Sequence, residues 1–182
     1  KWSLKAMHKL IVTSTTYRQV SRNDERDLEW AARLQKDPEN ILWSRQIRRR
    51  LTGEMLRDTL LTVSGSLSNG KGGPGVRPPL PREIISTLLR NQWPVSKNES
   101  DHRRRSIYLF ARRNLRYPIF ELFNRPALAE SCTARMVSTT ATQSLGLLNS
   151  EFTQTSAVRL AKHVINEART PPQQLTLCYK LL

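Results

Sequence analysis

The sequence predicts a mainly α-helical fold, an irregular array of several helices with long loops and one short extended segment. Apolar residues recur at helical spacing along most of the chain. Capping residues stand before several of these stretches, and glycine and proline separate them. The 182 residues are 38% hydrophobic and 25% charged, so the chain is long enough for one domain with a core and has a globular composition.

Residues 1–64 are expected to form the N-terminal helices. Ser3 is placed to cap a first helix with an apolar face, and residues 23–37 favour a second helix with acidic residues in its first turn. Asp37 precedes a proline, which suits the first position of a helix, so a third helix is predicted after it. Thr52 is placed to cap a fourth.

Residues 65–81 are rich in glycine and proline and are expected to be a loop. Its glycine-lysine-glycine stretch lacks the hydroxyl residue that follows lysine in a phosphate-binding loop, so we interpret it as an ordinary turn. Residues 82–182 are expected to return to helix, starting near Pro81 and interrupted before Pro94. The first of these helices carries four apolar residues, Ile84, Ile85, Leu88 and Leu89.

Residues 105–111 are the predicted extended segment. Four apolar or aromatic residues with high β propensity lie between two arginine clusters and are too few for a helix of their own. We expect Ile107 and Leu109 to be buried on one side of this segment. Pro118 is placed to start a helix, and Pro171 stands at the start of the last one.

Positive charge is the most distinctive feature of the composition. The net charge is +15, and 22 of the 30 basic residues are arginine, which binds carboxylate, phosphate or sulfate through paired hydrogen bonds. Residues 41–57 carry +4 and residues 101–116 carry +5, and together they would attract anions if the fold makes them adjacent. A solvated face of ion pairs with this or neighbouring domains is the alternative. The candidate residues for binding an anion or a partner are Arg48, Arg49, Arg50, Arg103, Arg104, Arg105, Arg112, Arg113 and Arg116.

The sequence contains no recognisable catalytic constellation or metal site. Asp101 and His102 are the candidate polar site, because a histidine beside a carboxylate can act as a general base, but a structural hydrogen bond is the alternative. Cys132 and Cys178 are too few for a zinc site and either pair or remain free thiols. No C-x-x-C-H motif, signal peptide or stretch of roughly 20 apolar residues occurs.

Nucleic acid is a disfavoured partner. The aromatic residues near the arginines occupy positions expected in a core, and no zinc finger, ribonucleoprotein motif or basic zipper is present.

Several motifs follow one another in an order that is typical of one family. They are "DPENILWSRQIRRRLTGEMLRDTLLTVSG", "GGPGVRPPLP", "NQWPVSK", "DHRRRSIYLFARRNLRYPIFELF" and "SCTARMVSTTATQSLGLLNSEF". Through them the chain resembles the PSD-one domain, a planctomycete-type domain of unknown function. The similarity runs nearly end to end and implies that residues 1–182 are an interior piece of a single such domain, truncated at both ends.

The resemblance also implies a context. Such domains are typically found in large proteins that carry a planctomycete cytochrome c domain and are generally predicted to be exported. We therefore expect an exported protein with haem c on another domain and no cofactor in this chain. The family offers no established catalytic residues to carry over. Asn124 and Ala127 stand where acidic residues are expected, and Thr142 stands where proline is usual.

Together these observations favour a non-enzymatic accessory or docking domain of a large exported, cytochrome-linked protein. Its arginine-rich face is expected to bind an anionic, sulfated polysaccharide or other domains of the same polypeptide. Two alternatives stay open. One is an enzyme domain that acts on polysaccharide or in a redox complex, and the other is a nucleic-acid-binding module.

Overall fold

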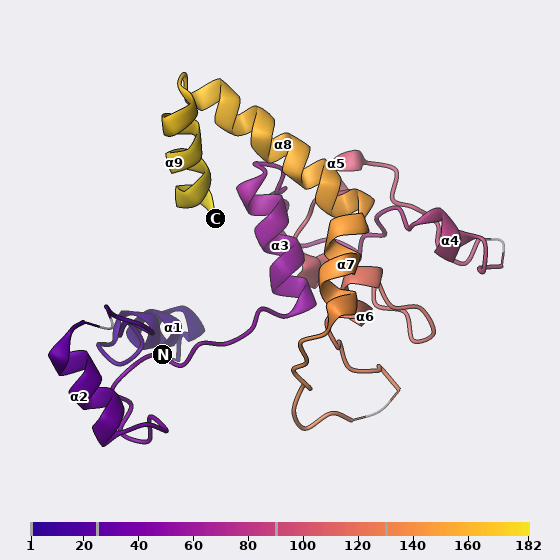
Figure 1. Ribbon diagram of the computed structural model, residues 1–182. Coiled ribbons are helices and arrows are strands. Elements are labelled where there is room, and N and C mark those ends of the chain that lie inside the picture. The colour runs from indigo at the N-terminus through magenta and orange to yellow at the C-terminus, as the bar shows by residue number, and fades with distance from the viewer. Residues whose placement is uncertain (1, 25, 90, 130) are drawn as a thin grey trace. The chain divides into compact units, whose positions relative to one another are not determined.

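The computed structural model is mainly α-helical, which confirms the predicted fold class (Figure 1). It describes residues 2–24, 26–89, 91–129 and 131–182. Within these ranges there is no β-sheet, only isolated bridges between single residues. The chain divides into two compact units, residues 1–50 and residues 51–182, and each is described by itself.

The first unit contains the helices α1 (Leu4–Thr13) and α2 (Leu28–Lys36). Both begin at side-chain caps, of which Ser3 was predicted. Ser3 Oγ accepts a hydrogen bond from an amide in the first turn of α1, and the Asp27 carboxylate accepts from two amides of α2. Trp30 on α2 is buried, whereas α1 has no buried residue. The core of this unit therefore gathers around α2.

The third helix predicted after Asp37 is wrong, and the segment forms turns instead. A helix cap accepts from the second or third amide that follows it. The Asp37 carboxylate instead accepts from the amides of Ile41 at 2.8 Å and Leu42 at 2.9 Å. Asn40 and Trp43 have left-handed backbone conformations, with φ of 58° and 56°, which a right-handed helix excludes. Hydrogen bonds to one aspartate thus override the local helix signal.

In the second unit, the helix α3 (Gly53–Val63) is central. It contacts α6 (Pro118–Leu122), α8 (Glu151–Glu167) and the 3-10 turn η1 (Ser106–Tyr108), and Figure 1 shows it beside α8. These contacts bring segments that lie far apart in the sequence around one helix. The buried hydrophobic cluster of this unit consists of Val76, Leu109, Ile119 and Phe120.

Close packing of α3 against α6 depends on Gly53. A Cβ atom at this position would lie 2.8 Å from the carbonyl oxygen of Ile119 and 3.0 Å from Phe120 Cα. Backbone atoms cannot move aside as a flexible side chain can, so only glycine allows this approach. Thr52 caps the helix as predicted, because its hydroxyl accepts from the amide of Met55 at 3.3 Å.

The other helices of the second unit are α4 (Arg82–Ile85), α5 (Glu99–His102), α7 (Ala141–Asn149) and α9 (Pro171–Leu181). Both α6 and α9 start at a proline, as predicted. Residues 65–81 form no helix, which confirms the predicted loop. The helix expected from Pro81 is a single turn, so Leu88 and Leu89 lie outside it.

The segment predicted as extended over residues 105–111 is a 3-10 turn followed by one bridged residue. Leu109 is buried as predicted, but the expected burial of Ile107 is wrong, because this side chain is 81% exposed. A 3-10 helix repeats every three residues, so Ser106 and Leu109 share the buried side and Ile107 faces outward. Leu109 also bridges to Val76.

Candidate functional site

Arg57 on α3 joins the two basic stretches of the sequence within the second unit. Its side chain is fully buried. The guanidinium donates to the carbonyl oxygens of His102 at 2.6 Å and Arg104 at 2.8 Å, and to Ser106 Oγ at 3.3 Å. Burial lowers the pKa of Arg57. Through Nη1 and Nη2 this arginine holds residues 102–106 against α3, whereas its buried Nε has no hydrogen-bond partner in the described structure.

Asp58, the next residue of α3, binds the same segment. Its Oδ1 accepts from the amide of Ser106 at 2.7 Å and from the hydroxyl of Ser106 at 2.6 Å. Its Oδ2 lies 3.7 Å from Nε of Arg105, whose side chain is mostly exposed. The Ser106 hydroxyl therefore donates to Asp58 and accepts from Arg57, so it links these two charged side chains.

Arg104 holds the glycine-rich loop. Its guanidinium donates to the carbonyl oxygen of Gly70 at 3.3 Å and to that of Gly72, and it lies 4.0 Å from the centre of the Tyr108 ring. The Tyr108 hydroxyl accepts from the amide of Gly72 at 3.2 Å. A phosphate-binding loop turns its amides toward an anion, whereas this loop turns carbonyl oxygens toward a cation. Arg104 therefore serves as a structural anchor.

The remaining candidate arginines differ in their surroundings. Arg112 donates to the carbonyl oxygen of Gln92. Within the ranges that the structure describes, three arginines of the same stretch make no side-chain hydrogen bond or ion pair: Arg103, Arg113 and Arg116. The arginine triplet of the first unit is exposed: Arg48, Arg49 and Arg50.

His102 has a structural partner. Its Nε2 lies 2.7 Å from the carbonyl oxygen of Ser96. Since a carbonyl oxygen only accepts, Nε2 donates in this contact, and Nδ1 is the ring nitrogen left to accept a proton. The backbone of His102 accepts from Arg57, and Asp101 lies beside it on α5 without an ion pair to its ring in the described structure.

A second charged network was not anticipated from the sequence. Glu54 on α3 accepts from Arg135 at 2.9 and 3.1 Å through both carboxylate oxygens, and Arg125 Nε lies 3.5 Å away. Burial by itself raises the pKa of the Glu54 carboxyl, but the hydrogen bonds and positive charge of Arg135, together with hydrogen bonds from the Glu54 backbone and Thr52, outweigh it, and the pKa lies below its usual value. No local pattern signals a pairing across 81 residues. The network fastens the loop before α7 to α3.

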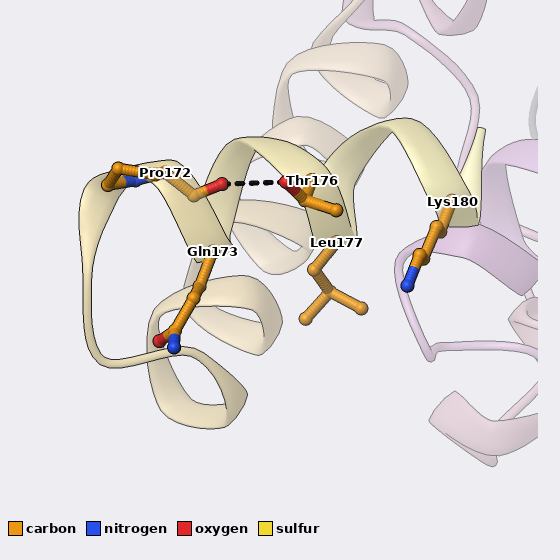
Figure 2. A pocket seen from close by; sticks show the side chains of 5 residues that line it. All are labelled: Pro172, Gln173, Thr176, Leu177 and Lys180. Atoms are coloured by element: carbon orange, nitrogen blue, oxygen red, sulfur yellow. Dashed lines mark hydrogen bonds between the residues drawn. The ribbon is translucent and has the colours of Figure 1, made fainter.

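The pocket in Figure 2 lies along α9 and has a volume of about 340 Å³. A single helix supplies its lining, Pro172, Gln173, Thr176, Leu177 and Lys180. The Thr176 hydroxyl donates to the carbonyl oxygen of Pro172 at 2.8 Å, so it continues the helix hydrogen bonding. Lys180 is the one ionisable side chain of this lining, and a lone surface lysine has no partner for acid–base chemistry here.

Other chemical features are sparse in the described part of the chain. No group of three or more His, Cys, Asp or Glu side chains there lies close enough to hold a metal ion. No helix in the same ranges has the length and apolar character needed to cross a membrane. Cys132 and Cys178 are both free thiols.

Comparison with known proteins identifies a family for the chain. A family model described as "PSD1: Protein of unknown function (DUF1553)" matches residues 1–182. No curated protein and no solved structure matches the chain significantly. The match confirms the resemblance drawn from the motifs. The chain therefore belongs to the PSD1 (DUF1553) family, whose function is unknown.

Proposed function

We propose that the chain is a non-enzymatic accessory or docking domain whose uncommitted arginines bind an anionic partner. The proposal rests on a difference among the arginines of residues 101–116, some of which are bound within the unit while others are not. Arg104, Arg105 and Arg112 are engaged by groups of the same unit. The other three arginines of the stretch, which make no such contact, keep their guanidinium groups available for bidentate binding of sulfate or carboxylate.

Three polar residues, of which Arg57 is fully buried and two are partly buried, support a structural role for the centre of the unit. Arg57 and the His102 ring bond to backbone carbonyl oxygens, and Asp58 accepts from a backbone amide. An enzyme site needs polar groups that are held in place and still open toward a substrate. Here the held groups face inward, while the available charge lies outside the core.

The setting of this domain is part of the proposal and rests on the family resemblance. The parent polypeptide is expected to be exported and to carry haem c on another domain. Intact mass and visible absorption of the native polypeptide test this: we expect a much larger protein with a Soret band. A haemless protein of about the size of this chain would contradict it.

Binding of the chain to immobilised heparin at increasing salt tests the docking role. We expect retention that weakens steeply with salt, because exposed charges are screened over about 10 Å at 0.1 M ionic strength. Retention that is absent or independent of salt would refute anion binding. A single-stranded oligonucleotide that displaces the protein from heparin more effectively than free heparin does would favour a nucleic-acid-binding module.

A further inference from the structure

Three loop segments of the second unit are fastened together beside the core. The amide of Val76 donates to the carbonyl oxygen of Tyr108, and the amide of Phe110 donates back to Val76, both at 2.8 Å. The amide of Ser96 donates to the carbonyl oxygen of Arg77, and the amide of Arg77 donates to the hydroxyl of Ser96, both at 2.9 Å. These hydrogen bonds hold Arg77 and Phe110 in place although neither lies on a helix.

An arginine and two aromatic rings meet on this loop platform. The Arg77 guanidinium lies 3.9 Å from the centre of the Phe110 ring, and the Trp93 ring meets Phe110 edge-on with the centres 6.3 Å apart. Trp93 Nε1 donates to the carbonyl oxygen of Pro78 at 2.7 Å, which fixes the indole. Phe110 remains 39% exposed, so part of its ring is accessible from outside.

A second arginine is bound to the segments that carry these rings. Arg112 follows Phe110 by two residues, and its Nη1 donates to the carbonyl oxygen of Gln92, the neighbour of Trp93. Neither Arg77 nor Arg112 has an acidic partner within the ranges that the structure describes. Each guanidinium has five N–H donors, so both keep donors for an external anion.

We propose that Arg77, Phe110, Trp93 and Arg112 form a subsite for an acidic polysaccharide that carries sulfate groups. The two guanidinium groups would each take a sulfate, and the exposed part of Phe110 would contact the apolar face of a sugar ring. The inference rests on the proposed anion-binding function and adds a location to the uncommitted arginines of residues 101–116, because the one hydrogen bond of Arg112 leaves its other donors unused. It adds three residues that the charge pattern of the sequence did not single out.

The geometry favours a sulfated glycan over a nucleic acid. A single-strand binder stacks bases on free aromatic faces. At this platform Arg77 covers one face of Phe110, and Trp93 meets the ring at 63° and donates its N–H internally, so no pair of open parallel faces is offered. Fixed guanidinium forks beside a small apolar surface match isolated sulfates on a sugar chain better than a stack of bases.

A fluorescent heparin octasaccharide measures the subsite directly. We expect Arg77→Gln/Arg112→Gln to bind it about tenfold more weakly than the wild type, since each partly exposed charge pair contributes up to about fivefold. The salt dependence should also flatten, with a log–log slope smaller by about one to two. The matched control, Arg18→Gln/Arg169→Gln, removes the same charge from exposed positions outside the candidate binding residues and should retain nearly all affinity.

Two further variants separate the subsite from general charge and from folding. Arg77→Lys/Arg112→Lys keeps the charge but loses the fork, so we expect an intermediate affinity. Phe110→Leu should weaken binding severalfold with the salt slope unchanged. Melting temperatures of all variants show whether the fold survives. If Arg77→Gln/Arg112→Gln unfolds, the affinity of Arg77→Lys/Arg112→Lys for the octasaccharide is the test instead. Full wild-type affinity of that variant would refute the subsite.

The outcomes distinguish the subsite from the function on which it rests. Equal losses in the subsite and control variants would refute the subsite and leave the docking function standing, with charge spread over the surface. Preference of the wild type for a single-stranded oligonucleotide over the octasaccharide would refute the polysaccharide assignment. Absence of octasaccharide binding by the wild type at low salt would refute the proposed function itself.

Discussion

Replacement of the buried Arg57 by methionine tests whether this arginine holds the second unit together. Arg57→Met leaves three acceptors without their donor, the carbonyl oxygens of His102 and Arg104 and the hydroxyl of Ser106. An unsatisfied buried acceptor costs about 1–3 kcal/mol. Methionine fills part of the volume and removes a buried charge, which offsets part of the loss. We expect the free energy of unfolding to fall by about 3 kcal/mol, as for breaking a buried charged network.

Urea denaturation followed by tryptophan fluorescence measures this loss. Arg113→Met is the matched control, because Arg113 is exposed and makes no side-chain contact in the described structure. Its effect should stay within about 0.5 kcal/mol. Arg57→Lys should fall between the two, since lysine keeps the charge but cannot reach three acceptors with one planar group. Equal unfolding midpoints for Arg57→Met and Arg113→Met would refute the anchoring role.

Three other measurements address particular contacts. The pKa of Glu54 is depressed in the folded state. The ionised carboxylate therefore stabilises the fold above the ordinary pKa of 4.5, and this contribution is lost as pH falls through the lower pKa of the folded protein. The melting temperature of the wild type should approach that of Glu54→Gln only at such acidic pH. A constant difference between the two proteins down to pH 2 would contradict this. Gly53→Ala should destabilise the fold by about 1–3 kcal/mol in urea, because the added Cβ meets the carbonyl oxygen of Ile119, and a neutral effect would disprove the close packing. Leu109→Ala should cost about 2–5 kcal/mol by the same assay, whereas Ile107→Ala should be nearly neutral; the reverse order would restore the extended interpretation of this segment.

Local chemistry explains why many helix boundaries could be predicted. A cap such as Ser3 or Thr52 acts on amides within its own turn, and proline at Pro118 restricts its own backbone, so neighbouring residues suffice. The same reasoning failed after Asp37, because its carboxylate reaches amides farther along the chain. It also failed at Ile107, since alternation was assumed where the backbone turns with a period of three.

The candidate site was less accessible to prediction. The charge pattern marked residues 101–116 as a candidate binding stretch, but it could not separate arginines that are buried from those that remain available. Arg104 and Arg113 belong to the same stretch, yet the first donates to loop carbonyls 32 and 34 residues away while the second is exposed. Whether an arginine is buried depends on which distant segment packs over it, and this packing cannot be read from the charge pattern.

The amino-acid sequence by itself determined the helical class, most helix starts, the glycine-rich loop and the family. Each of these depends on interactions within a few residues or on a linear order of motifs. Tertiary structure alone decided that Arg57 is a core residue, that Glu54 pairs with Arg135, and that Arg77 meets Phe110. Those contacts join segments separated by tens of residues, and their energies depend on burial and distance, which exist only once the chain has folded.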